Sequence, residues 1–289
     1  MNPRPPECKS TLRMHAYSEF LPLDNVERIL ENFREFLLVD LRRSKNTAPE
    51  MVRYVRKFLT TLQGSIVTRE CIRQYLKGLK GEATYRNCLA SLKVFFRDFL
   101  EMPQLVQSFR FPPSQFKPKV IPTKEKLGEF FEAIDDDIGK ALFLFYASTG
   151  LRKNEVLSLT HEDIDPSRRM VTPKCHEGVT KHSYLSFYNE ETEQHLKSIH
   201  SDSEKLFDLG DRQYKRIWKT AKAKRVIRIT PQKLREWFCS EMALNGVSDS
   251  YINAFCGRTP KSVLARHYLD YSPEKLKQIY EKAKIKVLS

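Results

Sequence analysis

From about residue 23 to residue 100, apolar positions recur every three or four residues, which is the period of an α-helix. The segment 26–43 shows the pattern most clearly, with an apolar residue at every third or fourth step. Three further segments share this period: 48–62, 68–79 and 84–100. Thr68 and Thr84 open the last two segments and are candidate N-caps. We therefore expect a compact all-α bundle of about four helices that ends near Leu105.

The helical pattern stops at residues 111–122 (FPPSQFKPKVIP), where four prolines fall within twelve positions. Proline density and basic charge are typical of an extended linker, although a surface loop within one domain would share them. Residues 1–20 carry no periodic pattern either. The expected organisation is a flexible N-terminus at 1–20, a helical domain at 21–110, a linker at 111–122 and a second domain at 123–289.

The second half of the chain mixes helical and strand patterns. A helix opening at Thr123 and a buried helix closed by Gly150 come first, followed by a short helix at 153–159. The segments 168–172 and 183–187 are strand-like and are separated by a turn-rich stretch. Later helical patterns cover 212–223, 231–246, 249–257, 260–269 and 272–288. The predicted fold class is mainly α with a small β-hairpin or sheet (α+β).

The net charge of the chain indicates what kind of molecule the protein binds. The chain has 50 Lys and Arg against 36 Asp and Glu, a net charge of +14, which favours polyanions, most often nucleic acid and sometimes an acidic membrane surface. A cationic solvated surface would give the same number. Residues 212–235 hold ten Lys or Arg and no acid, so this run favours a phosphate backbone as its counter-charge. Arg228 and Lys233 lie within it as candidate DNA contacts.

Other features restrict the class of protein. The six cysteines form no C-x-x-C pair, the N-terminus lacks the apolar core of a signal peptide, and no apolar run approaches the roughly 20 residues of a membrane span. We expect a soluble, cytoplasmic protein with no membrane partner. Asp135–Asp137 are adjacent rather than convergent, and Cys175, His176 and His182 lack a fourth ligand. The sequence therefore predicts no metal site, and we expect no cofactor.

Three arginines stand at positions that a surface cation does not need. Arg152 follows Gly150 at a helix junction, Arg235 lies among apolar residues, and Arg258 follows Gly257 at another corner. Guanidiniums bind phosphate through bidentate hydrogen bonds. Three of them in such settings can converge on one phosphate.

Three stretches that contain these arginines resemble the signature boxes of a known family. TGLRKNEVLSLTHEDID (149–165), TPQKLREWFCSEMALNGV (230–247) and FCGRTPKSVLARHYLDY (255–271) resemble, in this order, the boxes of the tyrosine recombinase (phage integrase) family. The resemblance covers residues 123–280 and is greatest to integrases of archaeal viruses and plasmids of the fusellovirus type. It implies a catalytic domain of that family, preceded by a helical core-binding domain.

The resemblance also implies roles for individual residues. Arg152 and Arg235 match the two catalytic arginines, and Glu155 matches the acid that holds the first of them. Tyr268 matches the nucleophile, with Tyr271 as the alternative. The family's hairpin lysine is expected after the first strand. Lys181 is preferred for it because its surroundings resemble the archaeal form of this turn, and Lys174 is the other candidate.

Two positions depart from the family pattern. Gln232 stands where the family has His or Lys, and an amide can donate a hydrogen bond to phosphate but cannot transfer a proton. Either the proton-transfer role is lost, or Lys181 or Lys233 carries it. Arg258 replaces the usual His, as archaeal members tolerate. His267, beside the proposed nucleophile, is either a packing residue or a phosphate contact.

The implied function is site-specific recombination of DNA. Such an enzyme cleaves and rejoins strands through a covalent 3′-phosphotyrosine. It binds double-stranded attachment sites as a homotetramer, and it serves the integration of a mobile element or provirus. Two alternatives remain open, a non-catalytic DNA-binding relative and a type IB topoisomerase-like nicking-closing enzyme. The final helix packs either on its own domain or on a neighbouring subunit.

Overall fold

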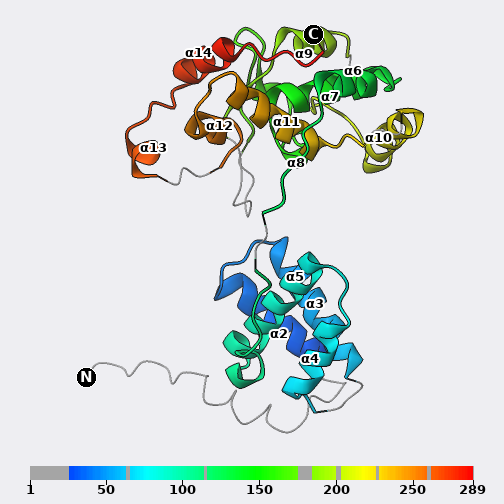
Figure 1. The fold of residues 1–289 in the computed structure, drawn as a ribbon, viewed down its shortest axis with the longest axis vertical. Coiled ribbons are helices and arrows are strands. Elements are labelled where there is room, and N and C mark those ends of the chain that lie inside the picture. Colours follow the sequence, from blue (N-terminus) through cyan, green and yellow to red (C-terminus); the bar gives the residue numbers. More distant parts are fainter. Residues whose placement is uncertain are drawn as a thin grey trace. The chain divides into compact units, whose positions relative to one another are not determined.

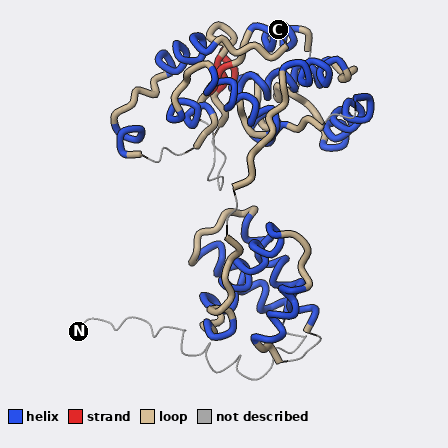
Figure 2. Tube along the Cα trace, in the orientation of Figure 1, coloured by secondary structure: helices blue, strands red, loops and turns tan. Residues whose placement is uncertain are grey.

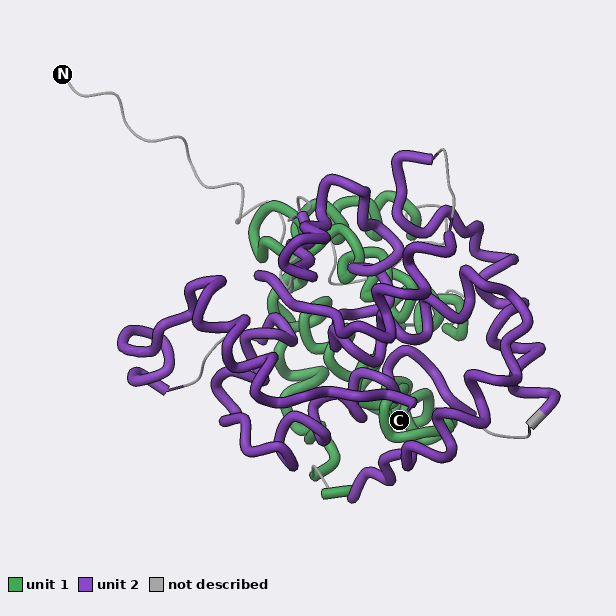
Figure 3. Tube along the Cα trace, turned by 90° about the horizontal axis from the view of Figure 1, so that it is seen from above, with its two compact units in different colours: residues 1–117 green, residues 118–289 purple. Residues whose placement is uncertain are grey.

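The computed structural model describes residues 26–62, 66–113, 116–174, 184–199, 203–225, 228–258 and 262–288. The chain divides into two compact units, Met1–Lys117 and Pro118–Ser289 (Figure 3). Each unit has its own hydrophobic core. None of the described helices is long and apolar enough to cross a membrane.

The first unit is a bundle of helices, as its apolar period predicts. The α-helices are α2 (Val26–Val39), α3 (Thr47–Thr61), α4 (Arg69–Lys77) and α5 (Glu82–Lys93), followed by a π-helical turn at Val94–Phe99 and a 3₁₀ turn at Pro103–Leu105. Edge-to-face contacts among Phe33, Phe58, Phe95 and Phe96 fill its core. Thr68 caps α4 as expected. The Thr84 cap was wrong, because α5 begins earlier, after Gly81 in a positive-φ conformation.

The second unit contains most of the helices and all of the described strands (Figures 1 and 2). Its helices are α6 (Lys124–Glu132), α7 (Asp137–Thr149), α8 (Lys153–Leu157), α9 (Glu190–Lys197), α10 (Asp211–Arg225), α11 (Pro231–Leu244), α12 (Asp249–Phe255), α13 (Val263–His267) and α14 (Pro273–Ala283), with a 3₁₀ turn at His161–Asp163. The antiparallel sheet has the order β1 (Ile164–Asp165), β2 (Met170–Val171), β3 (Ser186–Phe187). The predicted fold class is confirmed.

Helix α7 is the centre of the second unit. Its sequence is apolar on every side, which is the pattern of a helix surrounded by protein, and it is buried from Ala141 to Thr149. Helices α9 and α11 pack against it. The helix ends at Gly150, whose φ of +65° belongs to the left-handed region. A Cβ at this position would stand 2.3 Å from the ring of Phe238, so glycine is required there for space as well as for conformation.

The last carbonyl groups of α7 are used by three other elements. A helix leaves its final carbonyls without partners inside the helix. Here the carbonyl of Ser148 accepts from the Tyr280 hydroxyl of α14 (2.9 Å), and that of Thr149 accepts from the Ser186 hydroxyl of β3 (2.7 Å). The Gly150 carbonyl accepts from Arg235 of α11 (2.6 Å). The end of α7 therefore joins α14, β3 and α11.

Helix α14 packs on its own unit in this single chain, as one of the two alternatives expects. Leu276, Tyr280 and Ala283 on its apolar side are buried in the core of the second unit. The chain beyond the helix continues this packing, because Val287 is buried and its backbone N–H donates to Glu191 (2.7 Å).

Candidate active site

Arg152 occupies the corner between α7 and α8, where it is the N-cap residue of α8. Glu155 lies one turn later and binds it twice. Its carboxylate accepts from the Arg152 backbone N–H and from Nη1 of the guanidinium, both at 2.7 Å. The Arg152 side chain remains 28% exposed. Glu155 thus fixes both the main chain and the side chain of an arginine that solvent can still reach.

Arg235 projects from α11 into the same region and is 4% exposed. Its guanidinium donates to two backbone carbonyls, from Nη1 to Gly150 (2.6 Å) and from Nη2 to Cys256 (2.5 Å). It forms no ion pair with a carboxylate among the described residues, and burial lowers its pKa. Burial of a charge that contacts no carboxylate costs free energy. An anion bound beside Arg235 would relieve that cost.

Arg258 completes the group from the turn after α12. It follows Gly257, which has a φ of +54°. Its Nη1 donates to the Asn253 side chain (3.2 Å), and its Nη2 lies 3.8 Å from the sulfur of Cys239. The side chain is exposed.

Two of the arginines bond to neighbouring peptide groups of this same turn. Arg152 Nη2 donates to the Gly257 carbonyl (3.2 Å), next to the Cys256 carbonyl that accepts from Arg235. We call Arg152, Arg235 and Arg258 the arginine cluster. The turn at 256–258 contains Arg258 and accepts hydrogen bonds from Arg152 and Arg235. Three guanidiniums with Glu155 as the carboxylate bound to one of them form a site suited to a phosphate.

Gln232 and Lys233 lie near the start of α11 but are engaged elsewhere. Gln232 is exposed, and its amide donates to Glu236 (3.4 Å). Lys233 donates to the Val120 carbonyl (3.0 Å) and pairs with Glu236 (3.2 Å), which also binds Lys119 (2.6 Å). Glu236 therefore binds Gln232 and Lys233, which the sequence predicts to contact DNA. Its position three residues after Lys233 and four after Gln232 on one helix was the available indication of this role in the sequence.

Of the two candidate lysines of the hairpin, Lys174 is among the described residues and Lys181 is not. Lys174 follows β2 and pairs with Glu162 (2.9 Å); this hydrogen bond raises the pKa of Lys174. Lys181 lies outside the described residues, as do Cys175, His176 and His182. Arg228 is described and exposed, just before α11.

Tyr268 and Tyr271 have opposite environments. Tyr268 ends the short helix α13, which projects from the body of the second unit (Figure 1), and the residue is 76% exposed. No described residue hydrogen-bonds to its hydroxyl, and no contact joins it to the arginine cluster. Tyr271 packs edge-on against Tyr251 and its hydroxyl is buried, also without a partner among the described residues. Burial raises the pKa of Tyr271. His267, beside Tyr268, is exposed.

One feature at this site was missed from the sequence. The sulfurs of Cys239 and Cys256 are 3.3 Å apart, directly behind the arginine cluster. Cys239 stands one helical turn after Arg235, and Cys256 precedes Gly257. Those two neighbourhoods were the available clue, but only the fold shows that the thiols meet.

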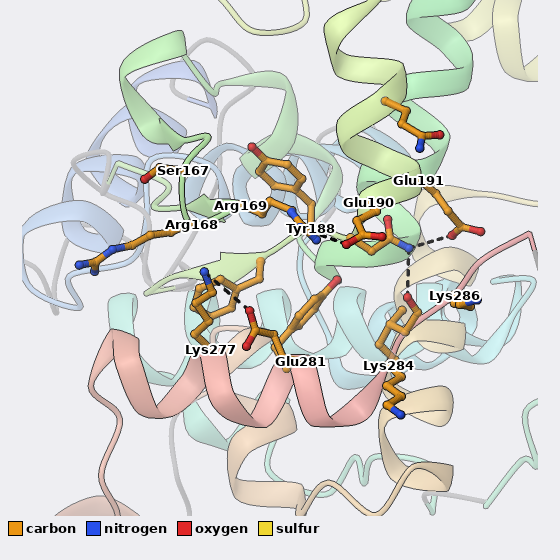
Figure 4. Close-up of a pocket in the computed structure, with 15 residues that line it drawn as sticks. Ser167, Arg168, Arg169, Tyr188, Glu190, Glu191, Lys277, Glu281, Lys284 and Lys286 are labelled. Atoms are coloured by element: carbon orange, nitrogen blue, oxygen red, sulfur yellow. Dashed lines mark hydrogen bonds and ion pairs between the residues drawn. The ribbon is translucent and has the colours of Figure 1, made fainter.

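A cavity of about 520 Å³ lies elsewhere, between the β1–β2 turn, the start of α9 and α14 (Figure 4). Ion pairs lie along its walls, between Arg169 and Glu190 (3.1 Å) and, within α14, between Lys277 and Glu281 (3.7 Å). None of the residues predicted for the active site lines it.

Comparison with known proteins identifies the family. The model of the archaeal phage integrase family matches residues 119–284. Tyrosine recombinase XerA of Thermococcus onnurineus (strain NA1) is 26% identical over 285 residues, covering 91% of this chain and 98% of that relative.

Two solved structures share the fold. One is a lambda integrase tetramer bound to a Holliday junction, with a TM-score of 0.63 and 13% identity, covering 88% of this chain and 86% of the other. The second is the Tn1549 transposon integrase in complex with circular intermediate DNA, with a TM-score of 0.62 and 18% identity, covering 88% and 99%.

The family match includes the arginine cluster, Gln232, Tyr268 and the whole of the sheet. It spans more than half of the chain, and the fold agrees with it along most of the length. The chain therefore belongs to the archaeal phage integrase family, and it is a tyrosine-type site-specific recombinase.

Proposed function

We propose that the arginine cluster binds the scissile phosphate of a DNA strand and that Tyr268 attacks it. The observation that carries this proposal is Arg235, a buried guanidinium held by two peptide carbonyls and without a carboxylate partner among the described residues. Arg152 donates to the same turn and Arg258 is part of it, and both are more exposed than Arg235. Together they can share the non-bridging oxygens of one phosphate.

These residues would stabilise the transition state rather than only bind the substrate. Negative charge builds up on the phosphate oxygens as a fifth ligand approaches phosphorus, and fixed cations offset it. Arg152 is oriented by Glu155, and Arg235 by its two carbonyls. Gln232, on the same helix as Arg235, would donate a neutral hydrogen bond to a phosphate oxygen.

The reaction is a transesterification that conserves the number of phosphate ester bonds. The Tyr268 oxygen forms a bond to phosphorus and the bond from phosphorus to the 5′ oxygen breaks, which leaves a 3′-phosphotyrosine and a free 5′-hydroxyl. Cations that hold the bound phosphate would favour the phenolate form of the phenol that attacks it. Lys181 is our candidate for the acid that protonates the leaving oxygen. Attack by another strand's 5′-hydroxyl reverses the step without ATP.

The two units would have different roles in acting on DNA. We assign residues 21–110 as a core-binding domain, 111–122 as the linker, and 123–289 as the catalytic domain. Lys174, Arg228, Lys233 and His267 are candidate contacts to the DNA around the cleavage point. A homotetramer would hold two double-stranded attachment sites for strand exchange. The origin that fits this assignment is a virus or plasmid that integrates into an archaeal host.

A nicked suicide duplex that carries the attachment site tests the chemistry. Cleavage near the nick releases a short fragment and traps the covalent protein–DNA adduct, which is scored on a denaturing gel. We expect an adduct with the unaltered chain and with Tyr271→Phe, and none with Tyr268→Phe. Tight DNA binding without any adduct from the unaltered chain would refute the proposal. It would indicate that a chain with Gln232 in place of His or Lys does not cleave DNA.

A further inference from the structure

Two thiols meet behind the arginine cluster. Cys239 comes from α11 and Cys256 from the turn after α12, and their sulfurs are 3.3 Å apart. Cys239 is half-buried and Cys256 is buried. The other described cysteines, Cys71 and Cys88, lie in the first unit and have no sulfur neighbour among the described residues.

The surroundings make the two thiols unequal. Cys256 can donate its S–H to Cys239, which lowers the pKa of Cys239, and the guanidiniums of Arg258 and Arg235 lower it further. The pKa of Cys256 is raised by its hydrogen bond to Cys239 and by burial. Cys239 is therefore the more readily ionised thiol of the pair and the more exposed of the two residues, and thiolates are the form that reacts with oxidants.

We propose that Cys239 and Cys256 are a redox modification site, at which a reversible disulfide switches off DNA strand cleavage. The oxidant is a peroxide. The Cys239 sulfur attacks a peroxide oxygen and becomes a sulfenic acid, releasing one water from hydrogen peroxide. The Cys256 sulfur then attacks the Cys239 sulfur, the S–S bond forms and a second water leaves. Two thiols lose two electrons and one peroxide gains them. A dithiol reductant reverses the bond by exchange.

The effect on cleavage follows from the peptide groups beside Cys256, and this part of the inference rests on the proposed function. The Cys256 carbonyl holds Arg235 and the Gly257 carbonyl holds Arg152. A disulfide requires sulfurs about 2 Å apart, so the two sulfurs, 3.3 Å apart here, must approach by about an ångström. We expect side-chain rotation to supply part of this approach and a shift of the 256–258 turn towards α11 to supply the rest. A displacement of that size at a catalytic group can cost on the order of a hundredfold in rate.

Mapping the bond tests the modification site without any assay of activity. The full-length chain is treated with hydrogen peroxide, free thiols are alkylated, and the protein is cut by a Glu-specific protease, which separates the two cysteines at Glu241. We expect two peptides joined through Cys239 and Cys256 that separate on reduction. The same pair should form in Cys71→Ser and be absent from Cys239→Ser. Alkylation of both cysteines after peroxide treatment would overturn the proposal.

Adduct formation on the suicide duplex tests the consequence. Each protein is assayed oxidised and after dithiothreitol, and the ratio of the two rates is compared. We expect a loss of tenfold or more on oxidation, recovered by reductant, in the unaltered chain and in Cys71→Ser. The ratio should be near one in Cys239→Ser and in a second variant, Cys256→Ser, with folding checked by circular dichroism.

The outcomes separate the two proposals. A mapped disulfide that leaves the rate unchanged would overturn the switch. If the reduced, unaltered chain forms no adduct, it is the proposed function that fails, while the peptide map still decides whether the disulfide forms.

Discussion

Arg235 shows how one residue can serve both the stability and the chemistry of this fold. Its guanidinium is buried at the junction of α7, α11 and the 256–258 turn, and it donates to the carbonyls of Gly150 and Cys256. The Gly150 carbonyl accepts otherwise only from the more distant Cys256 thiol (3.8 Å) among the described residues. Removing one side of a buried hydrogen bond leaves the other side unsatisfied. The planar geometry that binds two carbonyls here is also the geometry that binds phosphate.

Replacing Arg235 by lysine should therefore affect both properties. A single ammonium cannot reach both carbonyls in the planar arrangement of a guanidinium, so we expect Arg235→Lys to lower the free energy of unfolding by about 1–3 kcal/mol. Cleavage should fall by on the order of a hundredfold. Urea unfolding and the rate of adduct formation measure the two effects. Arg212→Lys, on the exposed surface of α10, is the matched control and should change neither.

Arg152 should matter for cleavage and little for affinity. Binding energy for DNA is spread over many phosphate contacts, whereas stabilisation of the transition state is concentrated on the few groups at the reacting phosphate. We expect Arg152→Ala to retain DNA binding within a few-fold and to lose cleavage by at least about a hundredfold. Fluorescence anisotropy at fixed salt and adduct formation give the two values. An affinity that collapses in parallel with cleavage would contradict this assignment.

At the scale of elements, the sequence predicts well where apolar periodicity decides the structure. The bundle of the first unit, the buried α7 and the corner at Gly150 follow from patterns of three or four residues and from helix caps. Helix α9 does not, because its sequence EETEQHLK is polar and Thr192 is its buried residue, bonded to Ser148 (2.9 Å). Strand β1 was missed because a two-residue strand carries no period.

In the candidate site, too, some contacts could be predicted from the sequence and others could not. Glu155 was predictable, because a residue three positions from Arg152 in a helix lies on the same side as that arginine. The carbonyl acceptors of Arg235 were not, since peptide groups are identical at every position. The meeting of Cys239 and Cys256 joins residues 17 positions apart on different elements. Such contacts depend on how α12 returns to α11, which periodicity does not encode.

The end of α7 offers a test of packing between elements. Tyr280 is buried and its hydroxyl donates to the Ser148 carbonyl. Tyr280→Phe keeps the ring but leaves that carbonyl without its donor, so the free energy of unfolding should fall by about 1–2 kcal/mol. Urea denaturation measures the loss. Tyr184→Phe, an exposed position, should leave the unfolding midpoint in place, and an equal shift in both variants would argue against the role of this hydrogen bond.

At the scale of the whole molecule, two separately cored units share a strongly basic chain. The core of the first unit is built from residues before Phe109 and that of the second from residues after Val120. A unit with its own core can fold without the other. Affinity for DNA, in contrast, should depend on both, since each neutralised phosphate adds to the salt dependence of binding.

Residues 118–289 expressed alone should therefore unfold cooperatively but bind DNA less tightly than the full chain. We expect a single thermal transition by circular dichroism. The plot of the logarithm of affinity against the logarithm of salt concentration should have a shallower slope, because fewer counterions are released. An equal slope for the fragment and the full chain would mean that the first unit contacts no phosphates.

Arg152 and Arg235 donate to peptide carbonyls, and this has a consequence for which substitutions related proteins can accept. An acceptor that belongs to the backbone is present whichever side chain stands there, so mutation at position 256 can replace the thiol without removing the oxygen that binds Arg235. Gly150 lacks this freedom, because the Phe238 ring and a positive φ exclude other residues. At the 256–258 turn, related proteins must therefore keep the path of the backbone, whereas the side chain at position 256 can change.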